Sequence, residues 1–200
     1  MLNYTFEVYY VNPFLLKIQY LSGVMVDSYC RGYSTIVIHI EGYSMLRIEL
    51  RCFKNLGEPD KRRLYSYVYN MPADEVLITH VHQLNRDIED WLIETMSEYF
   101  GVYAENELVG TISLSKQHIG EGYASIGYEI FDGFRGMGIA SEAFSLMLDI
   151  AGSRGFKFVK GKVRKDNEHS LRIWKKHNAQ STDLADGMLE MRVEIKEKKC

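Results

Sequence analysis

Residues 127–140 read GYEIFDGFRGMGIA, and this stretch passes from an extended apolar segment through a glycine-spaced turn into a helix. Gly136 and Gly138 carry no Cβ and tolerate positive φ, so the backbone can turn tightly and point several N–H groups at one place. The free amides and the dipole of the following helix attract an anion there, and Ala140 is small enough to let it approach. The order strand, turn, helix therefore predicts a phosphate or pyrophosphate site.

Two common phosphate-binding loops do not fit this turn. A P-loop requires glycines five positions apart followed by Lys and Ser/Thr, and no such residues follow the glycines here. The dinucleotide fingerprint requires a third small residue where this chain has Ser141. A Gly-x-Gly turn also opens helices that bind no ligand, so both interpretations stay open for the turn alone.

The elements that follow the turn favour a ligand site. Apolar residues recur at helical spacing over residues 139–151, and Gly152 ends that helix. A strand is expected at about residues 156–163, followed by a second helix with Asn167 as its cap.

With these elements in order, residues 126–179 resemble the cofactor half of the GNAT superfamily of acyl-CoA-dependent N-acetyltransferases. Residues 135–140 match the family signature Arg/Gln-x-x-Gly-x-Gly/Ala, and Asn167 with Ser170 matches the Asn-x-x-Ser pair that opens the next helix. Gly127-Tyr128 and Glu142-Ala143 are similar to the branch that contains the ribosomal-protein N-terminal acetyltransferases. The resemblance covers about residues 45–200.

The resemblance implies an α/β (α+β) fold of GNAT type, with a mixed, mostly antiparallel sheet flanked by helices, and acetyl-CoA as the cosubstrate. It implies that pantetheine binds the backbone of a splayed strand at 125–131, and that N–H groups near Ile130 hold the oxyanion. Arg135 contacts phosphate through its side chain or, more commonly in this fold, the loop amides do so. The implied cofactor-binding residues are Tyr128, Ile130, Arg135, Gly136, Met137, Gly138, Ile139, Ala140, Asn167 and Ser170.

The sequence offers several candidates for the catalytic groups. Glu129 lies on the splayed strand and is either a general base or an ordinary surface carboxylate. His118 and Glu121, in the loop before that strand, are lesser candidates. Many family members carry a tyrosine four residues after the Ser of Asn-x-x-Ser, where it protonates the departing thiolate. This chain has Trp174 there, and an indole N–H has no useful acidity.

Composition limits the other function classes. The 200 residues, 46% of them hydrophobic, suffice for one good core. A net charge of −3 favours neither nucleic acid nor a membrane surface, and no apolar run is long enough for a membrane span. Without a signal peptide, a cytoplasmic protein is expected. His80 and His82 lack a third ligand at helical spacing, so no metal site is expected.

Two regions are expected along the chain. Residues 1–44 alternate apolar and polar side chains and predict a β-rich N-terminal extension, which packs on the domain, forms a homodimer surface or covers the substrate. Glu41-Gly42 is expected to close a hairpin onto the next strand. Residues 45–200 form the N-acetyltransferase domain, mostly helical between residues 58 and 100, with a hairpin at 101–115.

The sequence thus predicts an enzyme that moves an acetyl group from acetyl-CoA to a primary amine by direct attack in a ternary complex. The amine belongs to a protein N-terminus or to a small molecule. The alternative, supported by Trp174, is a regulatory module that binds acyl-CoA with weak or no catalysis. A third reading, a partner-binding protein without a cofactor, rests on the N-terminal extension alone.

Overall fold

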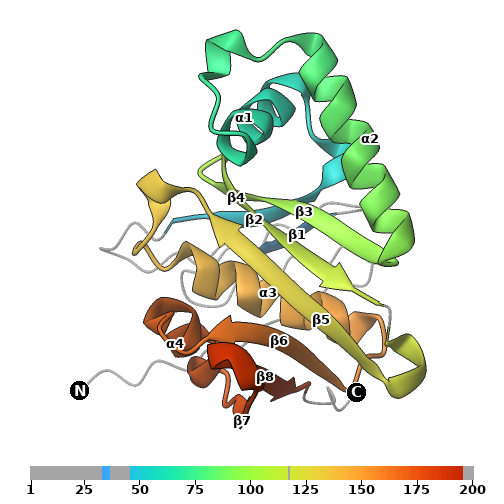
Figure 1. Cartoon of the computed structure of the whole chain (residues 1–200), viewed down its shortest axis with the longest axis vertical. Helices are drawn as coiled ribbons and strands as arrows, with labels where there is room; N and C mark the ends of the chain where they lie inside the picture. Colours follow the sequence, from blue (N-terminus) through green and yellow to red (C-terminus); the bar gives the residue numbers. More distant parts are fainter. Residues whose placement is uncertain (1–32, 37–45, 117, 196–200) are drawn as a thin grey trace, which may run out of the picture.

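The computed structural model describes residues 33–36, 46–116 and 118–195. Over these residues the chain forms an eight-stranded sheet with helices on both faces (Figure 1). This confirms the predicted α/β (α+β) architecture with a mixed, mostly antiparallel sheet. Helices α1 and α2 lie on one side of the sheet, and α3 and α4 lie on the other. Their bounds are Glu58–Val68 for α1, Ile78–Glu94 for α2, Ile139–Ser153 for α3 and Glu168–Lys176 for α4.

The strand order is β1-β2-β3-β4-β5-β6-β8-β7. Every neighbouring pair is antiparallel except β5 and β6, which are parallel. A parallel pair needs a crossover connection, and α3 supplies it here. The strands are β1 (Tyr33–Ile36), β2 (Ile48–Cys52), β3 (Ser97–Ala104), β4 (Glu107–Ser115), β5 (Tyr123–Ile130), β6 (Phe158–Arg164), β7 (Gln180–Asp183) and β8 (Met188–Glu194).

The larger core lies between the sheet and α3. The helix forms where the sequence predicts it, and its apolar stripe packs on residues of β2, β4, β5 and β6. Phe144 and Met147 in the middle of α3 are fully buried, as is Trp174 of α4, at 1% exposed. This packing fixes the beginning of α3 relative to the end of β5.

A second core lies on the opposite face, under α1 and α2. Leu64 of α1 and Leu84 of α2 are buried there against Tyr103 and Leu108 of the β3–β4 hairpin. Phe131, directly after β5, belongs to the same cluster, so α1 is packed close to the end of β5.

The expected helical stretch up to residue 100 is wrong at its end. The chain leaves α2 at Thr95, and Met96 takes a left-handed φ of 46°. Residues 97–100 then begin β3, which pairs with β4 and β2. Tyr99 keeps its contact with Trp91, with ring centroids 5.8 Å apart, although the two residues lie in different elements.

The N-terminal region is described only at Tyr33–Ile36, which pairs antiparallel with β2 from Tyr33 opposite Arg51 to Ile36 opposite Ile48. The rest of the predicted extension over residues 1–44, and the hairpin through Glu41-Gly42, lie outside the described residues. The boundary between residues 44 and 45 therefore stays a prediction. Within the described part of the chain, no helix is long and apolar enough to cross a membrane.

Candidate cofactor and catalytic site

A split in the middle of the sheet provides an open strand edge. β5 and β6 pair only through Tyr123–Ser125 and Phe158–Lys160, although both strands continue beyond this seam. On its other side β5 pairs with β4 along its length, up to Ile130 opposite Gly110. β5 is therefore the splayed strand expected at 125–131.

The hydrogen-bond phase of β5 decides which backbone groups face the split. Phe131 N–H donates to Val109 O at 2.9 Å, and hydrogen-bonded pairs alternate along an antiparallel ladder. The odd-numbered residues of β5 thus bond β4, while the N–H and C=O groups of Ile126, Tyr128 and Ile130 point toward β6. Two of these residues, Tyr128 and Ile130, are the ones whose backbone is predicted to bind pantetheine.

The glycine turn lies between the end of β5 and the start of α3. Gly136 and Gly138 both have φ of 81°, and a Cβ built on either one has no atom within 4 Å, so the space in front of the turn is open. Ser141 N–H and Glu142 N–H donate to Gly138 O at 3.0 and 3.2 Å. The N–H groups of Ile139 and Ala140 therefore precede the first hydrogen-bonded amides of α3. This is the local geometry that an anion at a helix N-terminus requires.

The side chain of Arg135 is engaged with other protein groups. Its Nε donates to Ile130 O at 2.9 Å, and its guanidinium pairs with Asp132 at 2.7 Å. A further nitrogen donates to the Tyr67 hydroxyl at 3.2 Å. Binding of phosphate by this side chain stays a prediction that requires it to leave these partners, whereas the loop amides need no such change.

Glu129 lies on the face of β5 that is turned toward α1. Its carboxylate accepts a hydrogen bond from the Tyr67 hydroxyl at 3.0 Å and lies 3.8 Å from the Arg135 guanidinium. The side chain is 57% exposed, so solvent and an acceptor can reach it. Burial and the hydrogen bond to Glu129 both raise the pKa of Tyr67, which keeps that hydroxyl a donor. The sequence did not suggest Tyr67, because only the fold brings α1 to β5.

Asn167 and Ser170 lie at the start of α4, across the split from β5. The Asn167 side chain accepts from Ser170 N–H at 3.1 Å, which confirms its role as a helix cap. Ser170 Oγ lies 2.6 Å from the hydroxyl of Tyr128. The split is therefore spanned by a side-chain contact that the backbone role expected for Tyr128 did not include.

Trp174 of α4 packs against β6, one of the two strands that border the split. A Cβ added at Gly161 of β6 would lie 2.4 Å from Trp174 Cζ2 and 3.2 Å from Ile126 O of β5. Glycine at 161 therefore leaves room for the indole against β6 and for the close approach of Ile126 O. Phe144 of α3 packs edge-on against the indole, with centroids 4.7 Å apart. The indole is thus packed between β6 and Phe144 of α3.

The lesser candidates lie away from this centre. His118 pairs with Glu121 at 3.1 Å and stacks on Tyr123 at 4.4 Å, beside the seam end of β5. His80 stacks on Tyr65 and serves as a cap for α2, because its Nδ1 accepts from Leu77 N–H. Among the described residues there is no group of three or more His, Cys, Asp or Glu placed to hold a metal ion.

A family model matches more than half of the chain. The model of the acetyltransferase (GNAT) family matches residues 65–179, which include α2, the split, the glycine turn and the start of α4. No curated protein sequence is significantly similar to this chain.

Solved structures with the same fold are distant in sequence. A probable acetyltransferase superposes with a TM-score of 0.60 at 20% identity, covering 74% of this chain and 93% of that one. The Campylobacter jejuni N-acetyltransferase PseH, solved in complex with acetyl coenzyme A, gives 0.58 at 14% identity, covering 74% and 99%. RimL, a ribosomal L7/L12 alpha-N-protein acetyltransferase solved with coenzyme A, gives 0.57 at 19%, covering 74% and 94%.

Proposed function

Because the chain belongs to the acetyltransferase (GNAT) family, with acetyl-CoA as the cosubstrate, we propose that it transfers the acetyl group to a primary amine in a ternary complex. The observation that carries this proposal is the open edge of β5, which is followed, after a short 3-10 turn at Asp132–Phe134, by the glycine turn. An extended pantetheine arm fits the free edge, and the pyrophosphate fits the turn.

We assign the cofactor contacts to two parts of the site, the edge of β5 and the glycine turn. The backbone N–H and C=O groups of Tyr128, together with the N–H of Ile130, would bond the pantetheine arm as a neighbouring strand does, while Ile130 O accepts from Arg135 Nε. The turn from Arg135 to Ala140 would bind the pyrophosphate through backbone amides and the α3 dipole. Asn167 and Ser170 would line the opposite side of the split, where α4 begins.

The acetyl transfer requires an attacking nitrogen without its extra proton and a stabilised oxyanion. We assign Glu129 as the base, because its exposed carboxylate lies on the same strand as the pantetheine-binding groups, on the face opposite α3. The N–H of Ile130, which points into the split, would hold the oxyanion. Tyr67 would orient the Glu129 carboxylate through its hydrogen bond of 3.0 Å.

The acceptor class is a primary amine, on a protein N-terminus or on a small molecule. RimL, described as an alpha-N-protein acetyltransferase, and PseH, described as an N-acetyltransferase, share the fold and thereby support an amine acceptor. The exposed side of β5 at Glu129 adjoins α1, so we expect α1, α2 and the loop at 118–122 to select the acceptor. A homodimer through the region before β2 is a further proposal, which size-exclusion chromatography tests.

A thermal-unfolding scan with acetyl-CoA, CoA and NAD tests the cofactor part first. Ligand at 100 times its Kd adds about 2.7 kcal/mol of stability, which raises the Tm by a few degrees for a domain of this size. We expect both CoA species to raise the Tm and NAD to leave it unchanged. A panel of short peptides with free N-termini and of small amines, followed by release of the CoA thiol, then tests turnover.

A second candidate function rests on Trp174, which takes the place of the expected tyrosine and is fully buried. A module that binds acyl-CoA to regulate a partner would need the split and the turn but no proton donor for sulfur. Acetyl-CoA binding without thiol release across the whole amine panel would favour this candidate over the enzyme.

A further inference from the structure

The leaving thiolate of CoA needs a proton donor, and the indole of Trp174 cannot supply an acidic proton. Tyr128 of β5 carries a phenol that reaches across the split. The hydroxyl of Tyr128 lies 2.6 Å from Ser170 Oγ, so it reaches from β5 to the start of α4. Its backbone belongs to the open edge of the same strand.

Packing holds the Tyr128 ring in this direction. As an even-numbered residue of β5, it faces α3 together with the buried residues Ile126 and Ile130. Its ring meets Phe144 of α3 edge to face, with centroids 5.8 Å apart and planes at 81°. Phe144 in turn packs on Trp174 at 4.7 Å. Three aromatic rings from β5, α3 and α4 therefore set the position of the hydroxyl.

The surroundings of the hydroxyl suit a proton donor. Burial, the largest effect, raises the pKa of Tyr128, so the phenol is protonated at neutral pH. Hydrogen bonds with Ser170 and Trp174 act in the opposite direction, because they stabilise the phenolate that forms when the proton leaves. Trp174, which replaces the expected acid, thus stabilises the phenolate form of Tyr128 on β5.

We propose that Tyr128 is the general acid of the acetyl transfer, with Ser170 and Trp174 as its positioning residues. This inference rests on the proposed function. The amine nitrogen bonds to the thioester carbon and loses a proton to Glu129, and the oxyanion forms at the Ile130 N–H. When the intermediate collapses, the C–S bond breaks, its electron pair goes to sulfur, and the Tyr128 hydroxyl gives its proton to that sulfur. Solvent at the α4 start returns a proton to the phenolate through Ser170.

The first test needs no acceptor. Free CoA is added to the wild-type protein, to Tyr128→Phe and to the control Tyr123→Phe, and the ultraviolet absorbance of the thiolate is followed across pH. A phenol that donates to sulfur stabilises the bound thiolate. We expect the pKa of the bound CoA thiol to be about one unit higher in Tyr128→Phe than in the wild type. Tyr123→Phe, on the same strand but at the seam, should match the wild type.

The second test uses turnover with acetyl-CoA and the best amine of the panel. Tyr128→Phe should lower kcat on the order of 100-fold while the Kd of acetyl-CoA stays unchanged. Adding Trp174→Tyr to Tyr128→Phe places a phenol beside the lost hydroxyl, and partial recovery of kcat in this double variant supports an acid role at this place. A purely structural role for Tyr128 predicts no recovery.

The outcomes separate the two proposals. CoA that binds with the same thiol pKa in the wild type and in Tyr128→Phe overturns the general-acid assignment and leaves the acyl-CoA site intact. CoA that does not bind the wild-type protein overturns the proposed function, and the general-acid assignment with it.

Discussion

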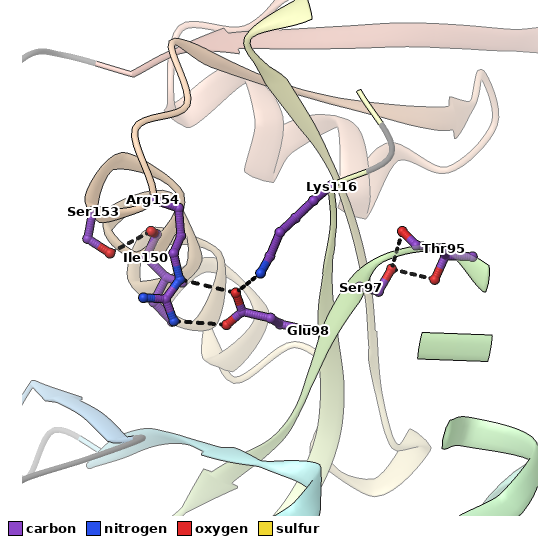
Figure 2. A network of polar contacts seen from close by, with 7 residues as sticks. All are labelled: Thr95, Ser97, Glu98, Lys116, Ile150, Ser153 and Arg154. Carbon is purple, nitrogen blue, oxygen red and sulfur yellow. Dashed lines mark hydrogen bonds and ion pairs between the residues drawn. The ribbon is translucent and has the colours of Figure 1, made fainter. Parts of the chain in front are cut away.

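The carboxylate of Glu98 holds the guanidinium of Arg154 through two parallel hydrogen bonds of 3.1 Å each (Figure 2). Lys116 forms an ion pair with the same carboxylate. Glu98 lies near the start of β3, Lys116 follows β4, and Arg154 is the C-cap of α3. The three residues therefore connect the end of α3 to the open end of the β3–β4 hairpin, at the opposite end of the helix from the glycine turn.

These ion pairs of Glu98 should make the free energy of unfolding depend on pH in the acidic range. Burial disfavours the charge of Glu98, but the hydrogen bonds from Arg154 and Lys116 outweigh it and lower the pKa of the carboxyl. A lowered folded pKa stabilises the fold above the unfolded value of about 4.3, and this contribution disappears as the pH falls through the folded pKa. We expect Glu98→Gln to lower the free energy of unfolding by about 1 kcal/mol at pH 7, and by less at pH 3.

Urea unfolding at both pH values measures this difference. Asp166→Asn is the control, since Asp166 pairs with Arg164 in a fully exposed loop and should leave stability unchanged. A constant effect of Glu98→Gln between pH 7 and pH 3 would contradict the assignment.

A side chain at position 138 should remove cofactor binding without unfolding the protein. Gly138→Val adds a branched side chain at a φ of 81°, in the open space where we place the pyrophosphate. The strain costs about 1–2 kcal/mol, and we expect the thermal shift with acetyl-CoA to disappear. Gly155→Val is the matched control, because Gly155 has a φ of 83°, is equally open and lies beyond the other end of α3. Similar acetyl-CoA affinity in the two folded variants would exclude the turn as the pyrophosphate site.

The close contact between β6 and α4 should show strong coupling. Gly161→Ala places a Cβ 2.4 Å from the Trp174 ring, and we expect a loss of about 1–3 kcal/mol from overpacking. Trp174→Phe alone leaves a cavity and also destabilises the fold. In the double variant the smaller ring makes room for the methyl group, so the combined loss should be smaller than the sum of the two. Additive losses in chemical unfolding would mean that the ring and the strand do not touch.

Removing the charge of Glu129 should slow the chemical step and leave the binding of acetyl-CoA unchanged. We expect Glu129→Gln to lower kcat on the order of 100-fold with the amine acceptor, because the base is lost. The Kd of acetyl-CoA, measured by calorimetry, should stay the same. Glu107→Gln at the start of β4 serves as the control, because it breaks an exposed ion pair with Arg63 of α1. An unchanged kcat in Glu129→Gln would mean that Glu129 is an ordinary surface carboxylate and not the general base.

The parts of the fold that were predictable depend on contacts close in sequence. The helix over 139–151 follows from its apolar spacing, and the cap of α4 follows from Asn167 and Ser170, which are three residues apart. The start of β3 was missed because Tyr99 continues the helical spacing of α2, whereas pairing with β4 is a tertiary effect.

The parts of the site that escaped prediction depend on distant contacts. Tyr67 reaches Glu129 across 62 positions, and Tyr128 reaches Ser170 across 42. Arg135 also matches the phosphate-loop signature, yet its side chain binds Ile130 O and Asp132. Spacing within one segment cannot reveal such partners, because each pair is brought together by helices and strands that lie between its members.

The short seam between β5 and β6 also affects how the protein behaves in solution. Beyond the three paired positions, the edge of β5 that faces β6 has no strand partner among the described residues, and such an edge is a site where an extended segment of another chain would pair. A bound pantetheine arm would cover this edge. Bound acetyl-CoA would then protect the protein from aggregation. The cofactor-free protein would precipitate more readily than the complex during concentration and storage.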